Sequence, residues 1–221
     1  MFPFPFSFFG SGAVEPPELE LIDNNFAMEF NGTDEYISAP NSMSALTGLS
    51  VSVWAYPTAT GTAAAEAMIS TDIAASAPRG FYLALYASNK VRWQIGTTAY
   101  NSKNSLDVNN TLNLNQWNHI VGTWNATTMS VYINGSLAGD EPSGVANGTF
   151  NTTNDILIGA RETTGGFFPG DLDEVAVWSK TLELADVQTI YNATNDNPGK
   201  CANLWSGGLG TGLVYWNRMG D

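Results

Sequence analysis

The sequence predicts an all-β protein, a two-sheet antiparallel jelly-roll sandwich with one short helix near its C-terminal end. From Phe26 onward, short runs of alternating apolar and polar residues follow one another along the chain. Turn residues separate these runs about every 8–12 positions, a spacing typical of sandwiches and barrels. Charged residues make up 13% of the 221 residues, against about 25% in an average soluble domain. Asn, Thr, Ser and Gly must therefore cover much of the surface, which suits sheets and turns.

The expected strands follow in order through the central body. The first begins at Phe26 and ends at the turn Asn31-Gly32. Ser88-Asn89 separates two apolar runs and predicts a hairpin, and Asn134-Gly135 is a second tight turn of the kind that tolerates positive φ. The other expected strands cover residues 36–39, 49–57, 80–86, 91–95, 117–124, 129–133, 156–158 and 172–178.

One helix is predicted, over residues 181–191, with Thr181 as its expected N-cap and acidic residues in its first turn. Its spacing places four apolar residues on one face, namely Leu184, Val187, Ile190 and Tyr191. This helix closes the predicted domain, which covers residues 26–195.

Residues 196–221 form a predicted Gly-rich C-terminal extension that ends in one short strand over residues 213–216. The strand is expected to complete an edge of the sandwich. Trp205 and Trp216 are interpreted as packing residues rather than as a ligand platform.

Charge and composition exclude several functions. The net charge of −13 argues against nucleic acid, whose phosphates need Lys and Arg, and against anionic membrane surfaces. Cys201 and His119 are the only residues of their types. An intrachain disulfide, a multi-Cys metal site and a catalytic triad supplied by this chain alone are therefore excluded.

Residues 1–25 form a predicted extended arm and linker. Its apolar residues are Phe2, Phe4, Phe6, Phe8 and Phe9. Pro3 and Pro5 prevent a helix, and the segment is too short to span a membrane. We expect these rings to anchor the protein to another copy of itself or to another protein; the alternative is that the arm folds back on its own sandwich.

Five sequence blocks resemble the laminin-G-like domain of the concanavalin A-like lectin/glucanase superfamily. They are FNGTDEYI (30–37), LSVSVWAYP (49–57), LNQWNHIV (114–121), MSVYING (129–135) and GDLDEVAVW (170–178). The resemblance implies two antiparallel sheets, with Trp117 and His119 in the core. It leaves the function open, because this scaffold serves lectins, adhesion modules, hydrolases and viral structural proteins.

The resemblance also implies which side chains of the 80–95 hairpin point inward, among them Phe81 and Trp93. The opposite set, Tyr82, Tyr86, Arg92 and Gln94, would face solvent and is the candidate ligand-binding surface for a glycan. The alternative is an ordinary exposed sheet face or a protein interface.

Acidic residues suggest a cation site or, less readily, catalysis. Asn31, Asp34, Asp171 and Asp173 are candidate Ca²⁺ ligands, with Glu35 beside them, because Ca²⁺ prefers carboxylate and amide oxygens. The alternative is that Asp34 and Asp173 cap backbone amides in tight turns. A glycoside hydrolase needs paired carboxylates, for which the candidates are Asp171, Asp173 and Glu174, or Glu18, Glu20 and Asp23. Neither set has the acid spacing of the superfamily's hydrolases, so no catalytic residue is predicted.

The ending WNRMGD (216–221) and the Phe-rich start are similar to bacteriophage virion proteins that carry this domain. The first interpretation is therefore a non-catalytic virion decoration protein, with a capsid or tail protein or other copies of itself as partners. The alternative is a carbohydrate-binding module or lectin, secreted or at a cell surface, with glycans as partners. A glycoside hydrolase is the third.

Overall fold

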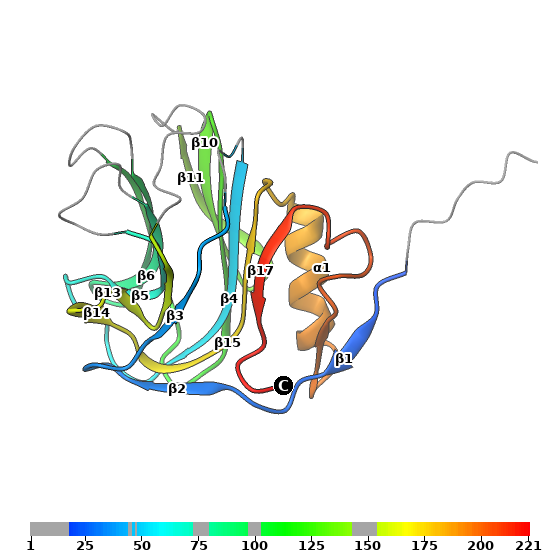
Figure 1. The fold of residues 1–221 in the computed structure, drawn as a ribbon, viewed down its shortest axis with the longest axis horizontal. Coiled ribbons are helices and arrows are strands. Elements are labelled where there is room, and N and C mark those ends of the chain that lie inside the picture. Colours follow the sequence, from blue (N-terminus) through cyan, green and yellow to red (C-terminus); the bar gives the residue numbers. More distant parts are fainter. Residues whose placement is uncertain (1–17, 44–45, 47, 73–79, 97–102, 143–153) are drawn as a thin grey trace, which may run out of the picture.

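Two antiparallel sheets packed face to face form the body of the protein in the computed structural model (Figure 1), which describes residues 18–43, 46, 48–72, 80–96, 103–142 and 154–221. The predicted jelly-roll sandwich is confirmed. The phenylalanines of the arm lie outside the described residues, so the arm, its anchoring role and the domain limits at residues 25 and 195 stay predictions.

The seven-stranded sheet carries the helix on its outer face. Its strands lie in the order β11 (Ser136–Pro142), β10 (Thr128–Ile133), β9 (Asn118–Asn125), β4 (Gly48–Pro57), β15 (Pro169–Trp178) and β17 (Leu213–Asn217), and β2 (Met28–Asn31) pairs with the first half of β15. The predicted C-terminal strand is thus confirmed as β17, at the edge of this sheet.

The second sheet has six strands. They lie in the order β3 (Ile37–Ala39), β12 (Ile156–Ile158), β5 (Glu66–Ser70), β6 (Phe81–Tyr86), β7 (Lys90–Gly96) and β8 (Lys103–Thr111). Two small ladders complete the described strands, β1 (Leu21–Asp23) with β16 (Lys200–Ala202) and β13 (Ala160–Glu162) with β14 (Gly165–Phe167). The predicted linker therefore contains a strand, β1.

Both predicted tight turns are present. Ser88 and Asn89 have φ values of 61° and 63° between β6 and β7. Asn134 and Gly135 have φ values of 50° and 75° between β10 and β11. Positive φ at both central residues matches the right-handed twist of the flanking strands, so these turns set the register of each hairpin.

The main core lies between the two sheets, and Trp93 and Trp124 are among its largest fully buried side chains. Trp93 on β7 donates a hydrogen bond from Nε1 to the Thr123 carbonyl of β9 at 2.9 Å. Its ring lies against Gly122, where an added Cβ would come within 2.8 Å of Trp93 Cδ2. Gly122 is therefore one position at which the two sheets approach each other closely.

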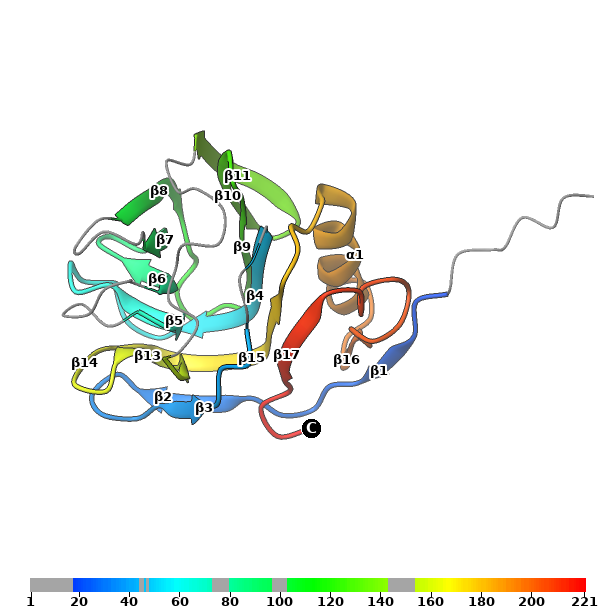
Figure 2. The ribbon, with the colours of Figure 1, turned by 45° about the horizontal axis from the view of Figure 1, so that its top comes forward.

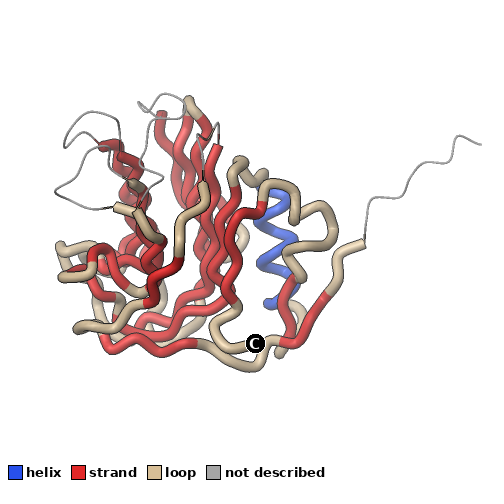
Figure 3. Tube along the Cα trace, in the orientation of Figure 1, coloured by secondary structure: helices blue, strands red, loops and turns tan. Residues whose placement is uncertain are grey.

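The described part of the chain contains one helix, α1 (Leu184–Asn195), on the outer face of the seven-stranded sheet (Figures 2 and 3). Val187 and Ile190 are buried there against Trp178, as their spacing predicted. Leu184, three residues before Val187 at the start of the helix, is 43% exposed. The predicted N-cap is wrong.

The helix begins later than predicted because Thr181 is engaged elsewhere. Its Oγ1 donates to the Trp124 carbonyl on β9 at 3.0 Å. Glu183 is the N-cap instead, and its backbone N–H donates to the Asp186 carboxylate at 3.3 Å. The acidic first turn was predicted correctly and stabilises the positive end of the helix dipole.

Candidate functional site

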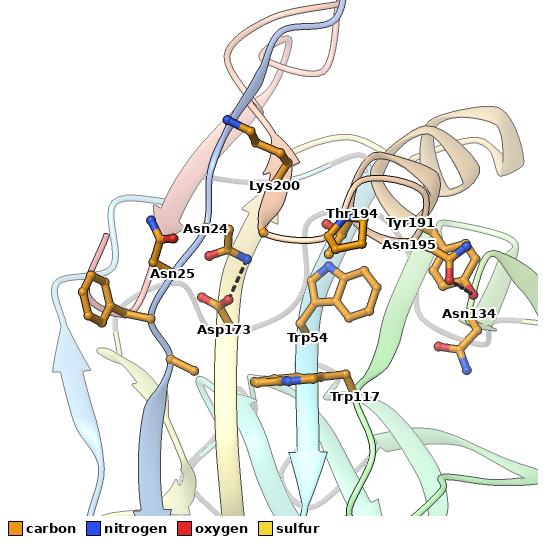
Figure 4. Close-up of a pocket in the computed structure, with 14 residues that line it drawn as sticks. Asn24, Asn25, Trp54, Trp117, Asn134, Asp173, Tyr191, Thr194, Asn195 and Lys200 are labelled. Atoms are coloured by element: carbon orange, nitrogen blue, oxygen red, sulfur yellow. Dashed lines mark hydrogen bonds between the residues drawn. The ribbon is translucent and has the colours of Figure 1, made fainter.

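A cavity of about 480 Å³ opens on the outer face of the seven-stranded sheet, beside α1 (Figure 4). We call it the outer-face cavity. It lies between strands β4 and β15, the loop that precedes β9, the β10–β11 turn, the C-terminal half of α1, the segment that leads into β16 and the segment between β1 and β2. Its lining residues are Asn24, Asn25, Phe26, Ala27, Trp54, Trp117, Asn134, Asp173, Tyr191, Thr194, Asn195, Pro198, Gly199 and Lys200.

Stacked aromatic rings support one wall of this cavity. Trp54 stacks on His119 with ring centroids 5.0 Å apart, and on Tyr191 at 5.9 Å. His119 is fully buried, and burial lowers its pKa to about 3, so the imidazole is neutral. Its Nε2 is 2.8 Å from Ser52 Oγ. The stack therefore holds Trp54 rigidly without introducing a charge.

Trp117 supplies an exposed ring to the same cavity. It precedes β9 and is 41% exposed, and the ring of Tyr56 contacts it edge-on at 5.6 Å. The prediction that Trp117 belongs to the core is wrong, whereas His119 is buried as expected, although on the outer face of the seven-stranded sheet and not between the sheets. The side chain of Asn118 fills the loop interior by donating to the carbonyls of Asn113 and Gln116, which leaves the Trp117 ring outside.

Asp173 is the carboxyl group in the cavity wall. It is 5% exposed, and its carboxylate accepts hydrogen bonds from Asn24 Nδ2 at 2.9 Å and from the Glu174 backbone N–H at 2.8 Å. Burial raises its pKa to about 7, and the neighbouring charges of Glu174 and Asp221 add to the rise. Its charge therefore changes near neutral pH.

A β-bulge determines where the acids of β15 point. Glu174 has φ 49°, and the pairing of β15 with β4 shifts register between Asp173 and Ala176. Glu174 consequently turns away from the cavity wall and accepts from Trp216 Nε1 at 2.6 Å and from Arg218 Nε at 3.2 Å. Asp173 keeps its place on the outer face beside Trp54.

Two polar atoms of the lining have no hydrogen-bond partner although they are buried, Asn24 Oδ1 and Thr194 Oγ1. Buried polar groups in proteins are nearly always paired. The Thr194 hydroxyl can turn toward a ligand without losing a protein hydrogen bond. The hydroxyl groups of a polar ligand would supply hydrogen-bond partners for these two atoms.

A second cavity, of about 470 Å³, lies at the edge of the six-stranded sheet. Two of its acidic side chains are already engaged: Asp72 pairs with Arg161 at 2.9 Å, and Asp155 accepts from Ser38 at 3.0 Å. The described residues that line it include no aromatic side chain. The outer-face cavity is therefore the better candidate for binding an organic ligand.

The predicted glycan-binding surface on the six-stranded sheet is largely covered by other parts of the chain. Tyr82 and Gln94 are fully buried, and Tyr82 donates to Gln94 Oε1 at 2.8 Å. The expectation that they face solvent is wrong, because Arg161 of the β13–β14 ladder lies over the Tyr82 ring at 4.8 Å. Tyr86 and Arg92 are half-buried and stack on each other at 3.6 Å, with Arg92 paired to Asp107.

The candidate calcium ligands make short-range contacts. Asn31 Oδ1 accepts from the Thr33 backbone N–H at 2.7 Å, and Asn31 Nδ2 donates to Asp34 at 2.8 Å. Asp171 lies on β15 opposite Glu29, and its pKa is raised by burial and then by Glu29. Among the described residues, no three His, Cys, Asp or Glu side chains are grouped to hold a metal. The contacts favour the turn-capping alternative, and calcium binding stays a prediction.

The sequence prediction missed the residues that form the outer-face cavity apart from Asp173. Trp54 and Trp117 stood in blocks assigned to the fold. Asn24 stood in the predicted linker, and Tyr191 and Thr194 stood on or beside the helix. The sequence did offer one signal of the site: tryptophans at alternating positions of the expected strands, with a polar, Asn-rich stretch beside them. The prediction that Trp205 packs is also wrong, since it is 64% exposed, whereas Trp216 packs against the helix-side core.

Two packed antiparallel sheets, with a helix and an aromatic-lined cavity on one outer face, define a lectin-like jelly-roll module. A family model described as the concanavalin A-like lectin/glucanases superfamily matches residues 31–188. The chain belongs to this superfamily, as the five sequence blocks indicated.

Solved structures share the fold at low sequence identity. A candidate carbohydrate-binding protein of Bacteroides ovatus has a TM-score of 0.66 at 14% identity, over 90% of this chain and 53% of that protein. A pentraxin of Limulus polyphemus has a TM-score of 0.58 at 19% identity, over 93% and 94% of the two chains. Domain 4 of the arabinanase AbnA of Geobacillus stearothermophilus, solved with arabinotriose, has 0.57 at 17% identity, over 77% and 80%.

A curated relative shares a shorter segment. The bovine adhesion G-protein coupled receptor D1 is 28% identical over 78 residues, which are 35% of this chain and 8% of the receptor. None of these similar proteins is described as a virion protein, so the virion location and the capsid or tail partners stay predictions.

In the described ranges, no helix is both long and apolar enough to cross a membrane.

Proposed function

We propose that the chain is a non-catalytic carbohydrate-binding module, acting at a cell surface or in secreted form, and that the outer-face cavity is its glycan site. The observation that carries the proposal is the exposed ring of Trp117 in a cavity that also offers Asp173, Thr194 and several side-chain amides. Ligand sites combine apolar and aromatic walls with a few convergent polar groups in cavities of roughly this size. The apolar C–H face of a sugar ring would pack on the indole, while its hydroxyls bond to the polar wall.

The chemistry of the wall supports binding rather than hydrolysis. Glycoside hydrolysis uses two carboxyl groups that flank the scissile bond. Asp173 is the one carboxyl side chain among the described lining residues, and Glu174 is committed to Trp216 and Arg218. The arabinotriose bound to domain 4 of AbnA belongs to that protein but is consistent with this proposal.

Replacing Trp117 by alanine is expected to weaken glycan binding at least about tenfold, because truncating a central aromatic anchor commonly costs 2 kcal/mol or more. The measurement is a glycan array, followed by calorimetric titration of the best oligosaccharide. Trp205→Ala is the matched control, since it removes an exposed tryptophan that does not line the cavity. Both variants should keep the urea midpoint of the unmodified protein to within a small shift.

Tyr86→Ala separates the two faces of the sandwich. Binding that is lost with Tyr86→Ala and retained with Trp117→Ala would place the glycan on the six-stranded sheet and contradict the proposal. Release of reducing sugar from a bound oligosaccharide would contradict the non-catalytic role.

A further inference from the structure

We infer that the outer-face cavity selects uncharged glycans and disfavours acidic ones, and that Asp173 is the specificity-determining residue. The inference rests on the proposed function and names the class of ligand for that site. It follows from the charges around the cavity, which are unevenly distributed between acids and bases.

The positive charges near the cavity are already neutralised. Lys200 contributes to the lining, but its ammonium pairs with Asp23 and points away from Trp54 in Figure 4. Arg218 pairs with Glu174 at 3.2 Å and lies 3.9 Å from Asp221. Arg218 is therefore already engaged, and Lys200 would have to leave Asp23 and turn toward the cavity to hold the carboxylate or sulfate of an acidic sugar.

The carboxylate of Asp173 is not balanced in the same way. Asp173 faces the cavity with an amide donor, Asn24, and a backbone N–H as its partners, and neither carries a charge. Glu174 and Asp221 add to the rise of its pKa, but both lie beside Arg218, so the unbalanced charge is that of Asp173 itself. An anionic ligand group would meet this field in a partly desolvated wall, where charge repulsion is stronger than in water.

The hydrogen-bonding groups favour the same class of ligand. When it is ionised, Asp173 can accept hydrogen bonds but cannot donate them, and the unpartnered Asn24 Oδ1 is also an acceptor. Sugar hydroxyls donate to such groups, whereas ionised carboxylates and sulfates cannot. A neutral oligosaccharide thus fits both the charge and the donor–acceptor pattern of the wall.

The test is a glycan array at pH 8 that carries neutral oligosaccharides beside their sulfated and sialylated counterparts. The unmodified protein is expected to bind each neutral glycan at least about tenfold more tightly than its acidic counterpart. Asp173→Asn should narrow this ratio, whereas Asp155→Asn, which removes the same charge at the edge of the other sheet, should leave it unchanged. Lowering the pH to 5.5 should narrow the ratio for sulfated glycans in the unmodified protein but not in Asp173→Asn, because sulfate stays ionised while Asp173 becomes neutral.

The outcomes separate the two proposals. Equal or tighter binding of acidic glycans that is still lost with Trp117→Ala would overturn the selectivity and leave the glycan site in place. If Asp173→Asn leaves the ratio of neutral to acidic glycan affinity unchanged, Asp173 does not determine the selectivity. Binding to no glycan, or binding indifferent to Trp117→Ala, would overturn the proposed function and this inference with it.

Discussion

Replacing Trp93 by alanine is expected to lower the free energy of unfolding by about 3–5 kcal/mol, the usual cost of truncating a large buried aromatic side chain. Trp93 is fully buried between the sheets, contacts Phe81 at a ring distance of 5.8 Å and donates to the Thr123 carbonyl. Its loss would leave both a cavity and a buried carbonyl without its indole donor. Urea unfolding followed by circular dichroism measures the change.

A double-mutant cycle with Gly122 identifies the cause of this loss. Gly122→Ala alone should cost about 1–3 kcal/mol by overpacking, because its Cβ would meet the Trp93 ring at 2.8 Å. In the Trp93→Ala background the same change should be close to neutral, so the two effects should be strongly non-additive. If the two stability costs were additive, the Trp93 ring and Gly122 would not interact energetically. Trp205→Ala should shift stability by no more than about 0.5 kcal/mol.

The fold could be predicted because its signals are local. Alternation places Trp93 on the same side as Val91 and Ile95, and all three are fully buried. The turns at Ser88-Asn89 and Asn134-Gly135 define two hairpins by residue type alone. Such patterns do not depend on what lies above the sheet, so they can be read in a single sequence.

The candidate site could not be predicted from the same signals, because long-range packing decides which sheet face is covered. Tyr82 alternates outward as expected, yet Arg161 closes over it from about 80 residues along the chain. Trp117 carries the sequence signature of a core residue but precedes the strand whose first side chain, Asn118, takes the interior position. The outer-face cavity unites residues from the predicted linker, from strands β4, β15 and β16, from two loops and from the helix, and no spacing in the sequence links them.

The bulge at Glu174 is a further feature that the alternation of apolar and polar residues cannot predict. Asp173 and Val175 would share a face in a regular strand, but Val175 lies in the core whereas Asp173 lines the outer-face cavity. An inserted residue reverses the side on which each following side chain lies. The unusual environment of Asp173 is a consequence of this insertion.

Replacing Asp173 by asparagine is expected to stabilise the protein at pH 8 and to make its stability less dependent on pH. The ordinary pKa of 3.8 applies to this carboxyl in the unfolded chain, whereas burial raises its pKa to about 7 in the folded protein. Between these values the folded state binds more protons, so the free energy of unfolding falls as the pH rises. Below pH 3.8 the carboxyl is protonated in both states and contributes no penalty, and above about pH 7 the full penalty is present.

The expected gain at pH 8 is about 2–3 kcal/mol. Each pH unit between the two pKa values is worth about 1.4 kcal/mol, which sets a ceiling near 4 kcal/mol, and a weaker hydrogen bond from the Glu174 N–H offsets about 1 kcal/mol of it. Asparagine can fill the site, since Asn24 can rotate its amide so that the unpartnered Oδ1 accepts from the new Nδ2. Urea unfolding at pH 5 and pH 8 should show the two proteins diverging as the pH rises, while Asp155→Asn stays within about 0.5 kcal/mol of the unmodified protein. A loss of stability at pH 8 would mean that the Asp173 charge is needed to hold Asn24 against the cavity wall.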